Sequence, residues 1–138
     1  MSVLPPYVRR DLLRVVLLLI GAVTVLTGLV QLCAPGPVLD LLSSDSTRIS
    51  RHLFATVGMF MVVVGGLLVQ ALLTPAPPPY LLFWTGLQKF GAFALVGVGV
   101  IRDLFGSLAL LVAFFDLATA LLCWLMARRL ATAAAVHP

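Results

Sequence analysis

Residues 81–116 read LLFWTGLQKFGAFALVGVGVIRDLFGSLALLVAFFD, and the architecture of the chain can be predicted from this stretch outward. Two long apolar runs flank the polar dipeptide Arg102–Asp103, and each run carries a single charge well inside it, Lys89 in the first and Asp116 in the second. A membrane-spanning helix needs about 20 predominantly apolar residues. The stretch therefore predicts two spanning helices joined by a tight turn at the dipeptide.

The composition of the whole chain excludes an ordinary soluble domain. Of its 138 residues, 62% are hydrophobic and 10% are charged, and the mean hydropathy is +1.15. A soluble fold of this length leaves too much of its surface in water to hide so many apolar side chains. The net charge of +4 comes mainly from arginines at the ends of apolar runs. They form no basic face, so we expect no nucleic-acid partner.

The charge-free runs divide into four helices. The proline-rich run Thr74–Pro79 must interrupt the second run, because consecutive prolines lack N–H donors and clash with helical geometry. In lipid only helices or closed barrels satisfy every backbone polar group. We predict an all-α integral membrane four-helix bundle, antiparallel and up-down-up-down, as a single transmembrane domain over residues 1–138. Its parts are helices at about 12–33, 52–73, 80–101 and 104–127, an outer loop 34–51, a proline-rich inner loop 74–79 and a flexible tail 130–138.

The distribution of arginines predicts an orientation. Four spans place both termini on one side, and five arginines flank that side, whereas three flank the other. Positive charge accumulates on the cytoplasmic side. We therefore expect a multi-pass protein of the cell membrane, the inner membrane of a bacterium, with both termini in the cytoplasm.

Lys89 and Asp116 are expected to meet. Each lies 13.5 residues from the centre of the predicted turn, which is about 20 Å along a helix, so the two charges fall level inside the membrane. Small residues around both positions favour close helix packing. The pair is either a static clip that fixes helix register or a functional group that binds a ligand, relays protons or binds a charged partner helix. Gln88 could add a hydrogen-bonding group or could face another helix or a partner subunit.

Two stripes of small and polar residues predict helix-packing seams. A pocket enclosed by the bundle is the alternative, and Thr24 and Thr85 would lie within it. The stripe on the first helix comprises Arg14, Leu17, Gly21, Thr24, Gly28 and Gln31. The stripe on the second helix comprises His52, Thr56, Met59, Val63, Gly66 and Gln70.

The predicted outer face carries His52 beside Arg48 and Arg51. These residues are either interfacial polar groups or contacts for an anion or a quinone headgroup. Cys33 and Cys123 are expected at opposite ends of the bundle, too far apart for a disulfide within one chain. The sequence has no phosphate-binding glycine loop, zinc motif or nucleophile elbow. We expect no catalytic residues, no metal and no cofactor.

The layout is similar to that of the DoxX-like group of small bacterial four-helix membrane proteins. The resemblance rests on an arginine-led first helix with Gly21 and Gly28, the stretch Ala34–Pro37, and a glycine-containing second helix from His52 to Gln70. It implies an accessory membrane subunit near redox or quinone-linked complexes. The Lys89 and Asp116 pair is not part of this resemblance.

Three functions follow from these observations as hypotheses. The first is a non-catalytic accessory or assembly subunit that packs with other membrane proteins or with itself. The second is a proton-linked carrier or small-ligand binder that uses Asp116, Lys89 and Gln88. The third is a redox accessory that contacts a quinone headgroup on the outer face. A small multidrug transporter is disfavoured, because the first helix has no acidic residue within the membrane.

Overall fold

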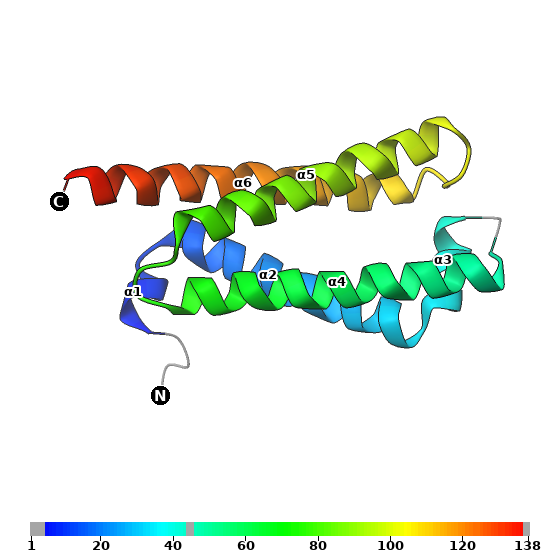
Figure 1. Cartoon of the computed structure of the whole chain (residues 1–138), viewed down its shortest axis with the longest axis horizontal. Helices are drawn as coiled ribbons and strands as arrows, with labels where there is room; N and C mark the ends of the chain where they lie inside the picture. Colours follow the sequence, from blue (N-terminus) through cyan, green and yellow to red (C-terminus); the bar gives the residue numbers. More distant parts are fainter. Residues whose placement is uncertain (1–4, 44–45, 137–138) are drawn as a thin grey trace.

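The computed structural model describes residues 5–43 and 46–136, and these residues form helices and their connections without a strand. Of the helices in the described residues, α2, α4, α5 and α6 are long and apolar enough to cross a membrane. The prediction of an all-α protein with four such helices is confirmed. The elements are α1 (Pro6–Arg9), α2 (Leu12–Cys33), α3 (Pro35–Leu42), α4 (Arg48–Leu73), α5 (Pro79–Ile101) and α6 (Ala109–Val136), drawn in Figure 1.

Helix α4 begins four residues before the predicted start because Thr47 caps it. The Thr47 hydroxyl accepts a hydrogen bond from the backbone N–H of Ser50 at 3.1 Å, and the Ser50 hydroxyl accepts one from the backbone N–H of Thr47 at 2.8 Å. This reciprocal arrangement satisfies donors that a helix start otherwise leaves unpaired. The expected outer loop 34–51 is thus mostly helical, since it contains α3 and the first turn of α4.

The predicted bounds of the fourth helix, 104–127, are wrong at both ends. The turn after α5 is longer than a dipeptide, because α6 starts only at Ala109. Within the turn, Asp103 takes a left-handed conformation with φ of 57°, and the backbone N–H of Leu104 donates to the Gly99 carbonyl. Beyond 127 the helix continues through Val136, where a flexible tail is expected. Alanine, the best helix former, dominates residues 131–135. Residues 137–138 lie outside the described residues.

Helices α2 and α4 form the first helix pair, and the predicted seam on α2 is confirmed. All six residues of that stripe are buried, and they are the buried residues of α2. Contact is close enough to bring the two backbones together: a Cβ added at Gly28 would lie 2.8 Å from the carbonyl oxygen of Gly58, and one added at Gly65 would lie 3.2 Å from the carbonyl oxygen of Gly21. Small residues permit this approach between helices in lipid.

The predicted seam on the second helix is wrong. Met59 is 37% exposed and Val63 is 49% exposed. Helix α4 instead buries a face one position away, where Gly58 opposes Gly28 of α2 and Gly65 opposes Gly21. The buried residues of α4 are Gly58, Gly65, Leu68, Ala71 and Leu72.

Helices α5 and α6 form the second helix pair. A Cβ added at Gly86 would lie 2.7 Å from Nε1 of Trp124, so the indole fits against α5 only because residue 86 has no side chain. The indole N–H donates to the carbonyl oxygen of Phe83 at 3.2 Å. A glycine on one helix thus receives a large aromatic ring from the other.

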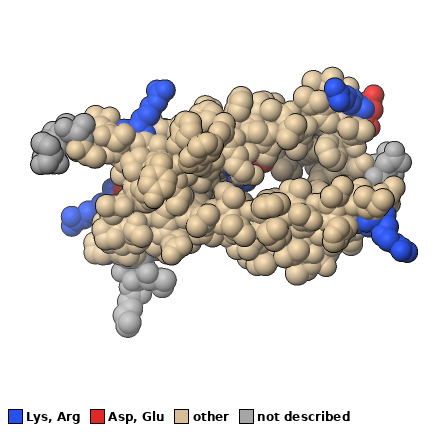
Figure 2. Space-filling view, in the orientation of Figure 1, with Lys and Arg blue, Asp and Glu red and all other residues tan. Residues whose placement is uncertain are grey.

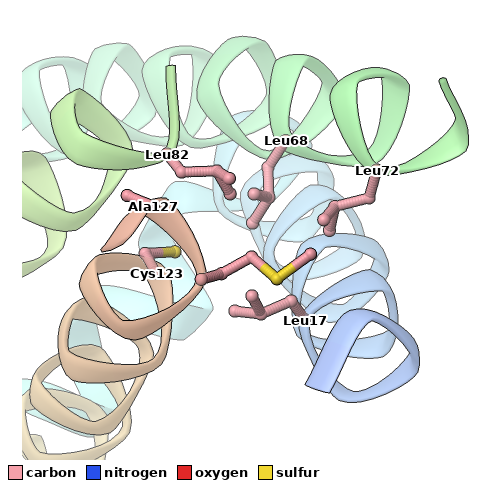
Figure 3. Close-up of a cluster of buried hydrophobic side chains, with 7 residues drawn as sticks. Leu17, Leu68, Leu72, Leu82, Cys123 and Ala127 are labelled. Atoms are coloured by element: carbon pink, nitrogen blue, oxygen red, sulfur yellow. The ribbon is translucent and has the colours of Figure 1, made fainter. Parts of the chain in front are cut away.

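The two helix pairs meet at their ends. At the end where α1 lies, called here the α1 end, side chains from all four long helices form one apolar cluster (Figure 3). At the opposite end, called the α3 end, the backbone N–H of Gly106 donates to the carbonyl oxygen of Leu42 at 2.8 Å. The cluster comprises Leu17, Leu68, Leu72, Leu82, Cys123, Met126 and Ala127.

Between these ends the two helix pairs leave a hollow. Every residue of α5 is described, and beyond Lys89 only Gly99 is buried, covered by the ring of Phe105 from the following turn. This half of α5 is therefore not covered by the first pair. Figure 2 shows the hollow as a gap between the two layers, with acidic and basic atoms visible inside it.

Candidate functional site

Lys89 and Asp116 form a buried ion pair between α5 and α6. The ammonium nitrogen of Lys89 lies 2.6 Å from Oδ1 of Asp116 and donates a hydrogen bond to it. The Lys89 side chain is 3% exposed and that of Asp116 is 9% exposed. The predicted meeting of the two charges is confirmed, although the turn between them is longer than predicted. The carboxylate is the more accessible partner of the pair.

Small residues bring the two backbones close enough for this contact. On α6, Asp116 shares its buried face with Ala113 and Ala120, which are both fully buried. On α5, Thr85 and Gly86 lie one turn before Lys89 and are also buried. A lysine side chain can therefore cross to a short aspartate on the neighbouring helix.

Phe115 borders the pair. The Lys89 ammonium nitrogen lies 5.8 Å from the centre of the Phe115 ring, a distance at which the π face of the ring attracts a cation. This contact adds an apolar wall beside the charges. The opposite charges of Lys89 and Asp116 cancel, and the Phe115 ring shields the ammonium group on one side.

The structure separates the other candidates for a ligand or proton site. Gln88 is exposed whereas Lys89 is buried, because adjacent positions on a helix do not share a face. Thr85 is 4% exposed, on the same face of α5 as Lys89. Thr24 is 2% exposed and packs its methyl group toward Gly65 of α4. Its hydroxyl has no hydrogen-bond partner among the described residues.

The outer-face candidates Arg48, Arg51 and His52 are exposed on the first turns of α4. Arg51 makes an ion pair with Asp40 at 3.4 Å and donates to the hydroxyl of Ser46 at 2.6 Å. These contacts tie α3 to α4. The Arg51 guanidinium therefore stabilises the packing of α3 against α4 at the α3 end of the molecule.

Sequence reasoning missed the role of Arg14, which lies at the α1 end. Arg14 is 5% exposed, and its guanidinium donates to the carbonyl of Leu72 at 2.9 Å, to that of Thr74, and to that of Pro75 at 3.4 Å. Tyr7 covers it, with 4.9 Å between the guanidinium carbon and the ring centre. The arginine thus satisfies carbonyl groups that the end of α4 leaves without helical partners.

Two signals in the sequence point to this contact between Arg14 and the end of α4. Arg14 falls on the buried stripe of the first helix, where a charge requires partners. The prolines that follow α4 cannot supply N–H groups to its last carbonyls. The tyrosine adds its own bond to the same helix end, because the Tyr7 hydroxyl donates to the Leu73 carbonyl at 2.5 Å.

Metal-binding and disulfide arrangements are not found among residues 5–43 and 46–136. In these ranges no three His, Cys, Asp or Glu side chains come together in a way that could hold a metal ion. Cys33 and Cys123 are both free, the first exposed and the second buried in the apolar cluster.

Comparison with protein-family models, with curated proteins and with solved structures finds no match to this chain. The resemblance to the DoxX-like group therefore stays a prediction.

Proposed function

We propose that the chain is a non-catalytic assembly subunit of the inner cell membrane, which packs against other membrane proteins or a second copy of itself. The observation that carries the proposal is the incomplete contact between its two helix pairs. Each pair is tightly packed internally, whereas the described contacts between the pairs named above lie toward their ends and leave the hollow between them uncovered.

In the proposed arrangement the four long helices cross the membrane antiparallel, up-down-up-down, with both termini in the cytoplasm. Contacts between the ends of α2 and α4 support an antiparallel order for these two helices. Arg14 at the start of α2 donates to Leu72 at the end of α4, and Gln31 at the end of α2 donates to the carbonyl of Phe54 near the start of α4 at 2.8 Å. The excess of arginines at the α1 end supports the cytoplasmic side.

Glycines with open space beside them support a partner helix. A Cβ added at Gly66, Gly91 or Gly97 would meet nothing within 4 Å, in contrast to the glycines inside the pairs. Small residues at unoccupied positions let a further helix approach the backbone closely. A neutral Lys89–Asp116 pair also leaves no net charge to oppose such a partner.

The experiment measures the mass of the purified protein in mild detergent against the monomer mass of 14.7 kDa. We expect an assembly for the wild type and a monomer for Gly91→Leu, which fills the open space without touching the monomer's own packing. Ala118→Leu, at an exposed position of α6, is the matched control and should keep the assembly. A monomeric wild type with no bound membrane protein would overturn the proposal.

A second candidate is a proton-linked carrier or small-ligand binder centred on Asp116. It is favoured by the greater exposure of the Asp116 side chain, 9% against 3% for that of Lys89, at a site that borders the hollow. Proteoliposomes containing Asp116→Asn should lose flux or binding while Gln88→Asn keeps it. Equal transport by both variants and the wild type would exclude this role.

A further inference from the structure

A groove with basic residues at one end and apolar walls below lies between the α1–α2 corner and α6. It is an open groove with a volume of about 420 Å³, within the range of small-molecule sites. Arg10 and Arg129 line it together with Asp11, and the remaining lining residues are apolar. Figure 2 shows basic atoms at both ends of the molecule, including this one.

The two walls of the groove have the same order of side chains. On α6, Arg129 is followed toward the membrane centre by Leu125 and Leu122, at helical spacings that keep them on one face. On the other wall Arg10 is followed by Leu13 and then by Val16 of α2. A ligand in the groove would therefore meet two guanidinium groups at one end and only apolar side chains below them.

The depth of the arginines matches the membrane interface. Arg129 lies 20 residues beyond Ala109, the first residue of α6, which is about 30 Å of helix, equal to the thickness of the hydrocarbon core. With Ala109 at one boundary, Arg129 reaches the headgroup level at the other, and the leucines before it lie at the depth of acyl chains.

The charge of the groove favours an anion. Neither Arg10 nor Arg129 has an ion-pair partner among the described residues, and both are exposed. The carboxylate of Asp11 is already engaged, since its Oδ1 accepts from the backbone N–H groups of Leu13 and Arg14 at the start of α2. The positive end of the helix dipole offsets its charge. The two guanidinium groups remain for a ligand.

We propose that this groove binds one anionic phospholipid, with its headgroup phosphate between Arg10 and Arg129 and part of an acyl chain along the leucines. A zwitterionic lipid fits less well, because its ammonium group would lie near two like charges. The inference does not depend on the proposed assembly role, because it concerns a different surface of the chain.

The test uses native mass spectrometry of the protein released from micelles that contain equal amounts of phosphatidylglycerol and phosphatidylcholine. We expect the wild type to keep one phosphatidylglycerol in preference to phosphatidylcholine. The double variant Arg10→Gln/Arg129→Gln should weaken this binding about thirty-fold, which corresponds to about 1 kcal/mol for each arginine near an anionic headgroup. Inorganic phosphate at millimolar concentration should not displace the lipid.

The control is Arg9→Gln/Arg128→Gln, which removes the same charge from neighbouring positions outside the groove and should retain the lipid. A further variant, Val16→Trp, keeps both arginines but fills the apolar part, and it should also lose the lipid. Circular dichroism checks that each variant stays helical. Equal loss in both double variants, equal retention of the two lipids by the wild type, or full retention by folded Val16→Trp would overturn the proposal.

Discussion

Removing one charge of the Lys89–Asp116 pair should destabilise the protein far more than removing both. The ammonium and carboxylate groups are 2.6 Å apart, and the two side chains are 3% and 9% exposed, so each single change leaves an unpaired charge in a buried site. Such changes cost about 3 to 5 kcal/mol in buried ion pairs. We expect this loss for Lys89→Met and for Asp116→Asn, and a change within about 1 kcal/mol for the double variant.

The assay is unfolding in mixed micelles by increasing amounts of denaturing detergent, followed by helicity. Gln88→Leu is the matched control: it alters the neighbouring polar side chain, which is exposed, and should change the free energy of unfolding by about 0.5 kcal/mol or less. Residues in direct contact give non-additive effects. Small, additive losses from the two single variants would refute the reasoning that mutual neutralisation holds these helices together.

Three further predictions concern close contacts between helices. Gly28→Ala places a methyl group 2.8 Å from a backbone carbonyl oxygen and should lower the free energy of unfolding by about 1 to 3 kcal/mol. Gly66→Ala enters open space and should raise it by up to about 1 kcal/mol. Thermal unfolding followed by circular dichroism compares the two variants. Arg14→Lys loses the planar fork that serves several carbonyls and should speed amide exchange in the last turn of α4. Gly86→Ala should displace the Trp124 indole, which a change in its fluorescence would reveal; unaltered emission would contradict the tight fit.

The meeting of Lys89 and Asp116 could be predicted from sequence because equal distance from a turn is a strong constraint on two neighbouring helices. The constraint tolerates error in the turn itself. The prediction placed the turn at Arg102–Asp103 with α6 directly after it, whereas residues 102–108 form the connection. The midpoint of the connection moves to residue 105, but the pair survives because Leu104 and Phe105 fold back against Gly99, which keeps the start of α6 close to the end of α5.

The seam of α2 could be predicted, but that of α4 could not be predicted from polarity. The chosen stripe on α4 begins at His52 and ends at Gln70, and both are exposed near helix ends, where polar groups can reach the membrane interface. The informative signal is a spacing. Gly21 and Gly28 are seven residues apart, and so are Gly58 and Gly65, which lets two backbones touch twice.

The roles of Arg14 and Trp124 depend on contacts that no local pattern specifies. Each donates to a backbone carbonyl of another helix, 58 and 41 residues away along the chain. A sequence shows that such a donor needs an acceptor, but tertiary packing decides which carbonyl it finds.

Among the described residues, the α3 end joins the two helix pairs through one backbone hydrogen bond, between Gly106 and Leu42, and this makes the molecule mechanically asymmetric. Each helix pair behaves as a rigid body, and an apolar cluster of seven side chains joins the two pairs at the α1 end. One hydrogen bond contributes only about 1 kcal/mol, so the described contacts oppose separation weakly at the α3 end. The easiest relative motion is therefore a scissor-like opening about the α1 end, which would widen the hollow toward the α3 end first.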